Sequence, residues 1–197
     1  MTEAKIADNA VTIAKLSVTS DGNSGQVLST NGSGTLSWVD NTAGATGATG
    51  SIAGQIAKLR GCRVIGIAGG AKKCRWLTEE ASFDAAIDYK DSNLPEALTE
   101  ICPKGIDIVF DNVGGEFLDT SLTLINMNAR IVLCGAISTY NNEVPAPGPS
   151  NYNMLIIQRA RMEGFIVLDY MDRFPQAIGE LMQWVQEGKI VYQEDIQ

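Results

Sequence analysis

The residues of this chain whose types and spacing favour chemistry are glycines at the ends of apolar runs. Gly47, Gly50 and Gly54 stand before and within a segment with helical periodicity. Glycine at the first position permits a tight turn, and at the second it lets a phosphate approach the helix N-terminus. At the third it lets the helix pack closely. The spacing predicts a phosphate-binding loop for a dinucleotide, and the strand that follows, closed by Gly69 and Gly70, strengthens this prediction.

Basic residues follow that strand, at the point that selects between dinucleotides. A site for NAD places Asp or Glu about 20 residues beyond the glycines, where the acid binds the ribose hydroxyls. This chain has Gly69 and Gly70 there, followed by Lys72, Lys73 and Arg75. Cations in place of the acid suit a ribose that carries a 2′-phosphate, so the pattern favours NADP. The alternative is that these residues only form the solvated face of a helix.

Composition excludes several other kinds of site. The chain has no histidine, which excludes histidine metal sites, Ser-His triads and a histidine base. Its four cysteines form no C-x-x-C pair, and we expect buried, reduced thiols, as in a cytoplasmic protein. The net charge of −8 and the pI near 4.5 argue against nucleic acid or an anionic membrane surface as a partner. No apolar run approaches the ~20 residues of a membrane span.

Alternating helices and apolar strands begin near residue 51, and these elements must position the residues above. Periodicity and stop signals predict helices over 51–60, 72–81, 94–102, 117–125 and 173–187, and strands over 63–68, 85–89, 106–110, 130–134 and 165–168. Near-continuous Val and Ile runs are typical of parallel strands that are covered on both faces. The fold class we expect is α/β, a doubly wound, Rossmann-like parallel sheet with ligands at the carboxyl ends of its strands.

The first 50 residues have a different composition, rich in Gly, Ser, Thr and Asn and without Cys or Pro. Short apolar alternations around Ser-Gly and Asn-Gly turns predict a β-hairpin or meander that is too small to fold alone. Glycine recurs at every third place over residues 44–50, the period of a collagen-like triple helix. Residues 7–16 and 25–38 resemble connector and hairpin repeats of bacteriophage tail-fibre and collar proteins, which are commonly trimeric fibres.

Residues 50–58, 110–116, 133–141 and 159–165 carry a second resemblance. Through them the chain from residue 50 to residue 197 resembles the cofactor-binding domain of zinc-independent medium-chain dehydrogenases and reductases. The most similar branch is that of leukotriene B4 12-hydroxydehydrogenase and the prostaglandin and alkenal reductases. The resemblance implies an NADP(H)-dependent oxidoreductase that transfers a hydride to the activated C=C bond of an enone or enal. It also implies a cytoplasmic homodimer.

The same resemblance assigns roles to residues. Gly47 and Gly50 would face the pyrophosphate, and Lys73 with Tyr89 would bind the 2′-phosphate of NADP. Tyr140 matches a tyrosine near the reacting end, where its phenol would polarise the carbonyl of the substrate. The residues implied around the nicotinamide and its ribose are Asn112, Cys134, Ala136, Ile137, Ser138, Phe165 and Val167. Packing alone is the alternative for the apolar members of this set and for both tyrosines.

The chain departs from that family before Gly47. A complete member begins with a GroES-like catalytic domain and continues past the position of Gln197, and nothing in this sequence corresponds to either part. Counting back from Gly47, the buried first strand falls on residues 40–42, where Asp40 and Asn41 are poor residues for a central strand. We therefore expect residues 1–42 to lie outside the sheet or to fill its central position imperfectly.

The sequence is thus interpreted as a chimera, with a tail-fibre-like segment over 1–43 and a truncated dinucleotide-binding domain over 44–197. One function that it supports is that of an NADP(H)-dependent oxidoreductase fragment. The alternative is a tail-fibre-like structural protein that trimerises and carries an inactive dehydrogenase fragment. Neither interpretation predicts a metal ion, a nucleic acid or a membrane as a partner.

Overall fold

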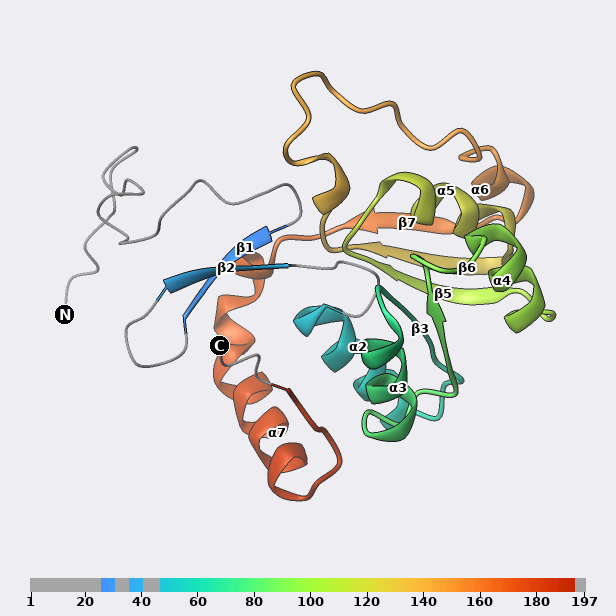
Figure 1. Ribbon diagram of the computed structural model, residues 1–197. Coiled ribbons are helices and arrows are strands. Elements are labelled where there is room, and N and C mark those ends of the chain that lie inside the picture. The colour runs from blue at the N-terminus through green and yellow to red at the C-terminus, as the bar shows by residue number, and fades with distance from the viewer. Residues whose placement is uncertain (1–25, 31–35, 41–46, 194–197) are drawn as a thin grey trace. The chain divides into compact units, whose positions relative to one another are not determined.

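A computed structural model describes residues 26–30, 36–40 and 47–193 of the chain (Figure 1). The chain divides into two units, one formed by residues 1–41 with 194–197 and one formed by residues 42–193. We call them the N-terminal unit and the α/β unit, and each is described by itself. Within the described residues, no helix is long and apolar enough to cross a membrane.

The N-terminal unit contains two antiparallel strands, β1 (Gln26–Thr30) and β2 (Leu36–Asp40). Gln26 is opposite Asp40 and Thr30 is opposite Leu36, so the strands have the register of a hairpin. This pairing confirms the hairpin expected from the short apolar alternations. The Asn-Gly turn at residues 31–35 and the glycine-repeat residues 44–46 lie outside the described residues. The likeness to tail fibres stays a prediction.

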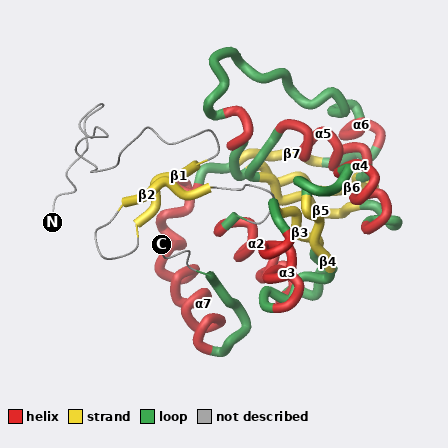
Figure 2. Tube along the Cα trace, in the orientation of Figure 1, coloured by secondary structure: helices red, strands yellow, loops and turns green. Residues whose placement is uncertain are grey.

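The α/β unit alternates helices and strands, as the periodicity predicts (Figure 2). Its elements are α2 (Ala48–Leu59), β3 (Ile65–Ala68), α3 (Ala71–Glu79), β4 (Ala85–Asp88), α4 (Leu94–Ile101), β5 (Ile106–Asp111), α5 (Gly115–Thr123), β6 (Ile125–Leu133), η1 (Ile137–Thr139), α6 (Met154–Ile157), β7 (Arg161–Gly164), η2 (Val167–Arg173) and α7 (Phe174–Gln186). The strands from β3 to β7 pair in parallel, which confirms the α/β class.

The parallel strands form two sheets, β3-β4 and β5-β6-β7. β3 and β5 are the first strands of these two sheets along the chain. In a doubly wound fold, the first strand of the domain would lie between them. No strand of the described residues pairs with both β3 and β5. Of the residues expected near that position, Asp40 pairs with Gln26, and Asn41 and Thr42 lie outside the described residues. Within the described residues, the parallel strands therefore form two separate sheets, and the expectation that residues 40–42 fill the central position poorly stays a prediction.

A shared hydrophobic core joins the two sheets. One cluster combines Ile67 and Ile87 of the β3-β4 sheet with Leu98 of α4, and Ile106 of β5 packs against it. A second cluster surrounds Leu122 of α5, between that helix and the β5-β6-β7 sheet. Because α4 and its neighbours contact both sheets, the carboxyl ends of β3, β4, β5 and β6 belong to one packed unit.

The strand predicted over 165–168 is wrong. The edge strand is β7, four residues earlier, and Val167 lies in the 3-10 helix η2. Pairing with β6 sets this register, since Arg130 is opposite Arg161 and β6 ends opposite Gly164. An edge strand accepts polar side chains, so the apolar pattern that follows it was misleading.

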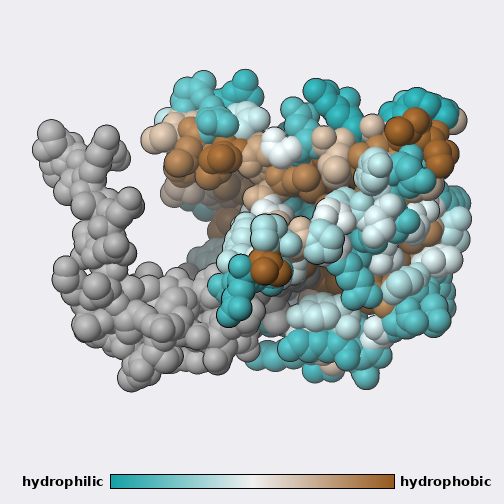
Figure 3. Space-filling model, turned by 90° about the horizontal axis from the view of Figure 1, so that it is seen from above, coloured by the Kyte–Doolittle hydropathy of each residue, from teal (hydrophilic) through white to brown (hydrophobic). Residues whose placement is uncertain are grey.

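Hydrophobic residues at the surface, such as Ile166 and Ile156, are common on this unit (Figure 3).

Candidate cofactor site

The glycine-rich loop opens α2. Gly47 is the N-cap residue, and its carbonyl accepts a hydrogen bond from the backbone N–H of Ser51 (2.8 Å). Among the described residues no side chain caps this helix, whose first turn also lacks an acidic residue. A Cβ atom on Gly54 would overlap the ring of buried Phe83, which confirms the close packing expected at that position. The helix N-terminus is thus suited to an anion, with Gly47 at the N-cap and Gly50 in the first turn.

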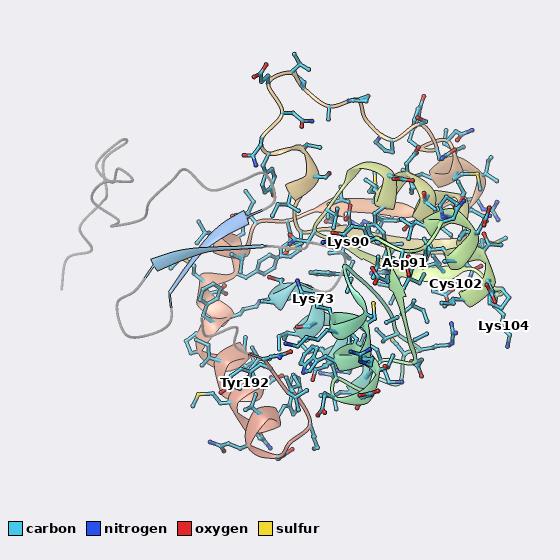
Figure 4. All side chains as sticks on the ribbon, viewed as in Figure 1. Lys73, Lys90, Asp91, Cys102, Lys104 and Tyr192 are labelled. Atoms are coloured by element: carbon cyan, nitrogen blue, oxygen red, sulfur yellow. The ribbon has the colours of Figure 1, made fainter. Side chains whose placement is uncertain are left out.

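A second group of residues lies at the carboxyl ends of β3 and β4. Lys73 is exposed in the first turn of α3, and Tyr89 and Lys90 directly follow β4 (Figure 4). A Cβ atom on Gly69 would lie 2.9 Å from Cε of Lys90 and 3.1 Å from the hydroxyl of Tyr89. Both side chains therefore cover the backbone of Gly69. Lys73 and Tyr89 were expected from sequence, whereas Lys90 was not.

Asp88 holds the two loops of this group together. Its Oδ1 accepts the backbone N–H of Gly70 (2.8 Å) and that of Lys90 (3.1 Å). Gly70 has a φ of 100°, a conformation that favours glycine, and this presents its N–H to the carboxylate. The acid at the end of β4 is thus bonded to backbone, and the side chain of Lys90 covers the neighbouring Gly69. The signal for this contact in the sequence is an aspartate at a strand end.

A cavity of about 530 Å³ lies at the carboxyl ends of β5 and β6. Its lining residues are Asp111, Gly114, Leu118, Leu133, Cys134, Gly135, Ala136, Tyr140, Gly164, Phe165, Ile166 and Asp169. Cys134, Ala136, Tyr140 and Phe165 of the expected nicotinamide residues are among them. Val167 is not, because it lies in η2 with 57% of its surface exposed.

Two turns that border the cavity are bonded to each other. The backbone N–H of Ile137 donates to the carbonyl of Asn112 (3.2 Å). The hydroxyl of Ser138 donates to the carbonyl of Val113 (2.6 Å). The resemblance implies that Asn112, Ile137 and Ser138 lie near the nicotinamide and its ribose. In the structure they lie beside the cavity, in the two turns that these hydrogen bonds connect.

Tyr140 turns its hydroxyl back toward this rim although much of the residue is exposed. The phenol oxygen accepts the backbone N–H of Ala136 (3.1 Å), and it lies 2.8 Å from the position of a Cβ on Gly135. With that acceptor role filled by a backbone donor, the phenol proton remains available for an acceptor in the cavity. The arrangement suits a hydrogen bond to a substrate carbonyl.

Asp111 was missed from the sequence, where it reads as the end of an apolar strand. Its side chain is fully buried, and its Oδ1 accepts the backbone N–H groups of Val113 (2.8 Å) and Gly114 (3.0 Å). Burial raises the pKa of this carboxyl, and the two backbone donors oppose the rise. An aspartate in front of a glycine pair that opens a helix was the available signal.

The cysteines are free, as expected, although Cys102 alone among them is buried. Cys62, Cys74 and Cys134 are half-buried, so the expectation of buried thiols is wrong for these three. Burial raises the pKa of the Cys134 thiol, and the charge of Asp111 adds to the rise, so the thiol is protonated at neutral pH. Across the described residues, no three His, Cys, Asp or Glu side chains are grouped so as to hold a metal ion.

Comparisons with known proteins identify relatives of this chain. The chain is 46% identical over 159 residues to the NADPH-dependent curcumin reductase of Escherichia coli, a match that covers 78% of this chain and 46% of that protein. It is also 46% identical over 155 residues to prostaglandin reductase 1 of Bos taurus, over 77% of this chain and 46% of that protein. The chain therefore spans about half the length of the curated relatives it matches.

A solved structure and a family model also match the α/β unit of this chain. CurA of Vibrio vulnificus in complex with NADPH superposes with a TM-score of 0.70 at 46% identity, over 76% of this chain and 46% of that one. This confirms the Rossmann-like fold. The model of the family described as zinc-binding dehydrogenase matches residues 48–187. The described residues do not fit a zinc site. By this match the chain belongs to the zinc-binding dehydrogenase family.

Proposed function

We propose that this chain is the NADP(H)-binding part of an oxidoreductase that reduces the activated C=C bond of an enone or enal. The observation that carries the proposal is that the side chains of Tyr89 and Lys90 cover Gly69 at the end of β3, while Lys73 is exposed in the first turn of α3, directly after the glycine pair. An NAD site would present a carboxylate there, whereas Asp88 is bonded to backbone N–H groups. The named reductases among the relatives support the same cofactor.

The cofactor would extend along the carboxyl ends of the strands. Gly47 and Gly50, in the first turn of α2, would bind its pyrophosphate through backbone N–H groups and the helix dipole. Lys73 and Tyr89 would bind the 2′-phosphate, with Lys90 as a second cation. Asn112 would lie beside the nicotinamide ribose, and the 530 Å³ cavity would hold the ring.

The chain's own residues also favour the reaction. The chemistry that a reduced nicotinamide supplies when bound is a hydride, which would go to the β-carbon of the substrate. Negative charge then develops on the carbonyl oxygen, and the Tyr140 phenol would donate a hydrogen bond to it. Ala136, Cys134 and Phe165 would exclude water from one face of the ring.

Cofactor binding tests the proposal. The purified chain is titrated with NADPH and with NADH while nicotinamide fluorescence is followed. We expect tighter binding of NADPH, and Lys73→Ala should remove most of the difference, at a cost of roughly 1.5–3 kcal/mol for a charge-assisted contact. Lys72→Ala, on the same exposed turn, is the matched control. Equal affinity of the unaltered chain for both cofactors would contradict the assignment.

The antiparallel pairing of β1 and β2 supports the second candidate, a tail-fibre-like structural protein with an inactive dehydrogenase part. In this proposal residues 1–43 and 44–197 are separate domains. Light scattering distinguishes the candidates. A dimer that binds NADPH supports the oxidoreductase, and a trimer that binds neither cofactor supports the fibre.

A further inference from the structure

Asp111 introduces an acidic charge into the wall of the proposed nicotinamide cavity. It is the last residue of β5, none of its surface is exposed to solvent, and it lines the 530 Å³ cavity beside Cys134. Asp169 is the other acidic residue of the lining, and it is exposed. The lining includes no lysine or arginine, within the part of the chain that the structure describes.

The contacts of Asp111 orient its carboxylate and offset only part of the cost of burying its charge, because burial still raises its pKa. Oδ1 accepts from Val113 and Gly114, and Oδ2 accepts from Gly114 (3.1 Å). These donors are neutral backbone N–H groups, and they lie at the N-terminus of α5. The carbonyl of Asp111 accepts the N–H of Cys134 (2.7 Å), which ties the end of β5 to the turn after β6. The carboxylate is therefore held in place without a cation in the cavity lining.

The other titratable groups that border the cavity come from three neighbouring segments. Cys134 follows β6 and is a protonated thiol, Tyr140 follows η1, and Asp169 lies in η2. None of them carries a positive charge. A buried carboxylate in such surroundings is destabilised, and a cation placed in the cavity would relieve this.

A nicotinamide ring is neutral when reduced and positively charged when oxidised. We propose that the Asp111 carboxylate acts as a counter-ion to the oxidised ring, so that the cavity prefers NADP⁺ over NADPH and favours hydride donation. This inference rests on the proposed function, which places the ring in this cavity. The charge is effective because the carboxylate is buried and already oriented when the ring becomes positive.

Asp111→Asn tests the inference because the amide retains Oδ1 as the acceptor for Val113 and Gly114 and loses only the second, longer contact of Gly114, that to Oδ2 (3.1 Å). The dissociation constants for NADPH and NADP⁺ are measured on the full chain, the first by fluorescence and the second by calorimetry. We expect the ratio of NADPH to NADP⁺ dissociation constants to fall by on the order of tenfold in the variant, with most of the change in NADP⁺ binding. Asp169→Asn is the matched control, and its effect should be less than about twofold because water and salt screen an exposed charge.

A purely structural role would weaken both cofactors equally and leave the ratio unchanged, which would overturn the inference. If the unaltered chain binds neither cofactor, the proposed function fails and the inference fails with it. The two failures are therefore distinguishable.

The pH dependence of the unaltered chain tests the inference without a variant that has to fold. Burial raises the pKa of Asp111, and NADP⁺ binding should lower it again. The preference for NADP⁺ should therefore be greatest above that pKa and disappear as the pH falls through it. The 2′-phosphate also titrates near pH 6, by analogy with other phosphate monoesters. Both cofactors carry it, so it cancels in the ratio, and a ratio that is constant with pH would overturn the inference.

Discussion

The two ends of the proposed cofactor site lie at the carboxyl ends of two different sheets, and they differ in where their charged groups lie. At the ends of β3 and β4, the charged groups Lys73 and Lys90 are exposed, and the acid Asp88 is bonded to backbone. At the ends of β5 and β6, the buried charge is that of Asp111, and most of the cavity wall is formed by apolar side chains and glycines. A phosphate can be bound by cations at the surface, whereas a nicotinamide ring needs a shaped cavity.

The two ends are expected to unfold together, because the cluster of α4 packs against both sheets. Leu122→Ala, at a position with no exposed surface, should lower the free energy of unfolding by about 2–5 kcal/mol. Leu77→Ala, in the cluster beside β3, should have an effect in the same range. Denaturant unfolding should show one transition in both variants. Met127→Ala, at an exposed position, is the control, and two separated transitions would show that the ends are independent.

Gly135→Ala should damage the nicotinamide end selectively. A Cβ there would lie 2.5 Å from Oδ1 of Asn112 and 2.8 Å from the hydroxyl of Tyr140, so both side chains must move. We expect a loss of roughly 1–3 kcal/mol of stability and weaker binding of NADPH and NADH alike. Gly164→Ala is the control. Gly164 lines the same cavity, but the nearest neighbour of a Cβ there would be 3.9 Å away. The prediction is wrong if the two variants behave the same in thermal unfolding and cofactor titration.

Lys90→Ala should affect the other end of the site alone. The lysine side chain covers Gly69, and its loss should weaken NADPH by about 1 kcal/mol while NADH is unchanged. The effect should decrease as salt is raised, because the lysine is exposed. Lys104→Ala, beyond the C-terminus of α4, provides the control in the same titrations (Figure 4). An equal loss for both cofactors would exclude a role at the 2′-phosphate.

The smallest effect concerns the ion pair that joins α2 to the start of β4. Lys58 donates to both oxygens of Asp84, and the N–H of Val64 donates to Oδ2 (2.6 Å). These bonds, that of Lys58 first, lower the pKa of Asp84. The stabilisation is therefore present above the pKa of the unfolded chain and is lost as the pH falls toward the lowered value. At this largely exposed site it amounts to about 0.2–1 kcal/mol.

Thermal unfolding from pH 7 to pH 3 measures this contribution. Asp84→Asn should be less stable than the unaltered chain at neutral pH and should approach it in acid. A constant difference across the range would show that the ion pair contributes nothing through its charge.

Residue types and spacing predicted most of the α/β unit. The role of Lys73 at the 2′-phosphate stays a prediction, made because a cation directly after a glycine pair has no packing reason to stand there. Helix and strand positions followed from hydrophobic periodicity, with the exception of the strand placed at 165–168. There the local pattern favoured the apolar run, and the pairing of β7 with β6 selected the more polar segment before it.

The sequence by itself determined the alternation of elements, the glycines that precede helices and the absence of histidine chemistry, since these depend on local propensity and composition. The tertiary structure alone decided that Asp111 is buried, that the Tyr140 hydroxyl accepts the N–H of Ala136 and that the Asp88 carboxylate accepts a backbone N–H. Burial, pKa and hydrogen-bond partners arise from elements distant in sequence, and no local pattern encodes which of those elements will meet.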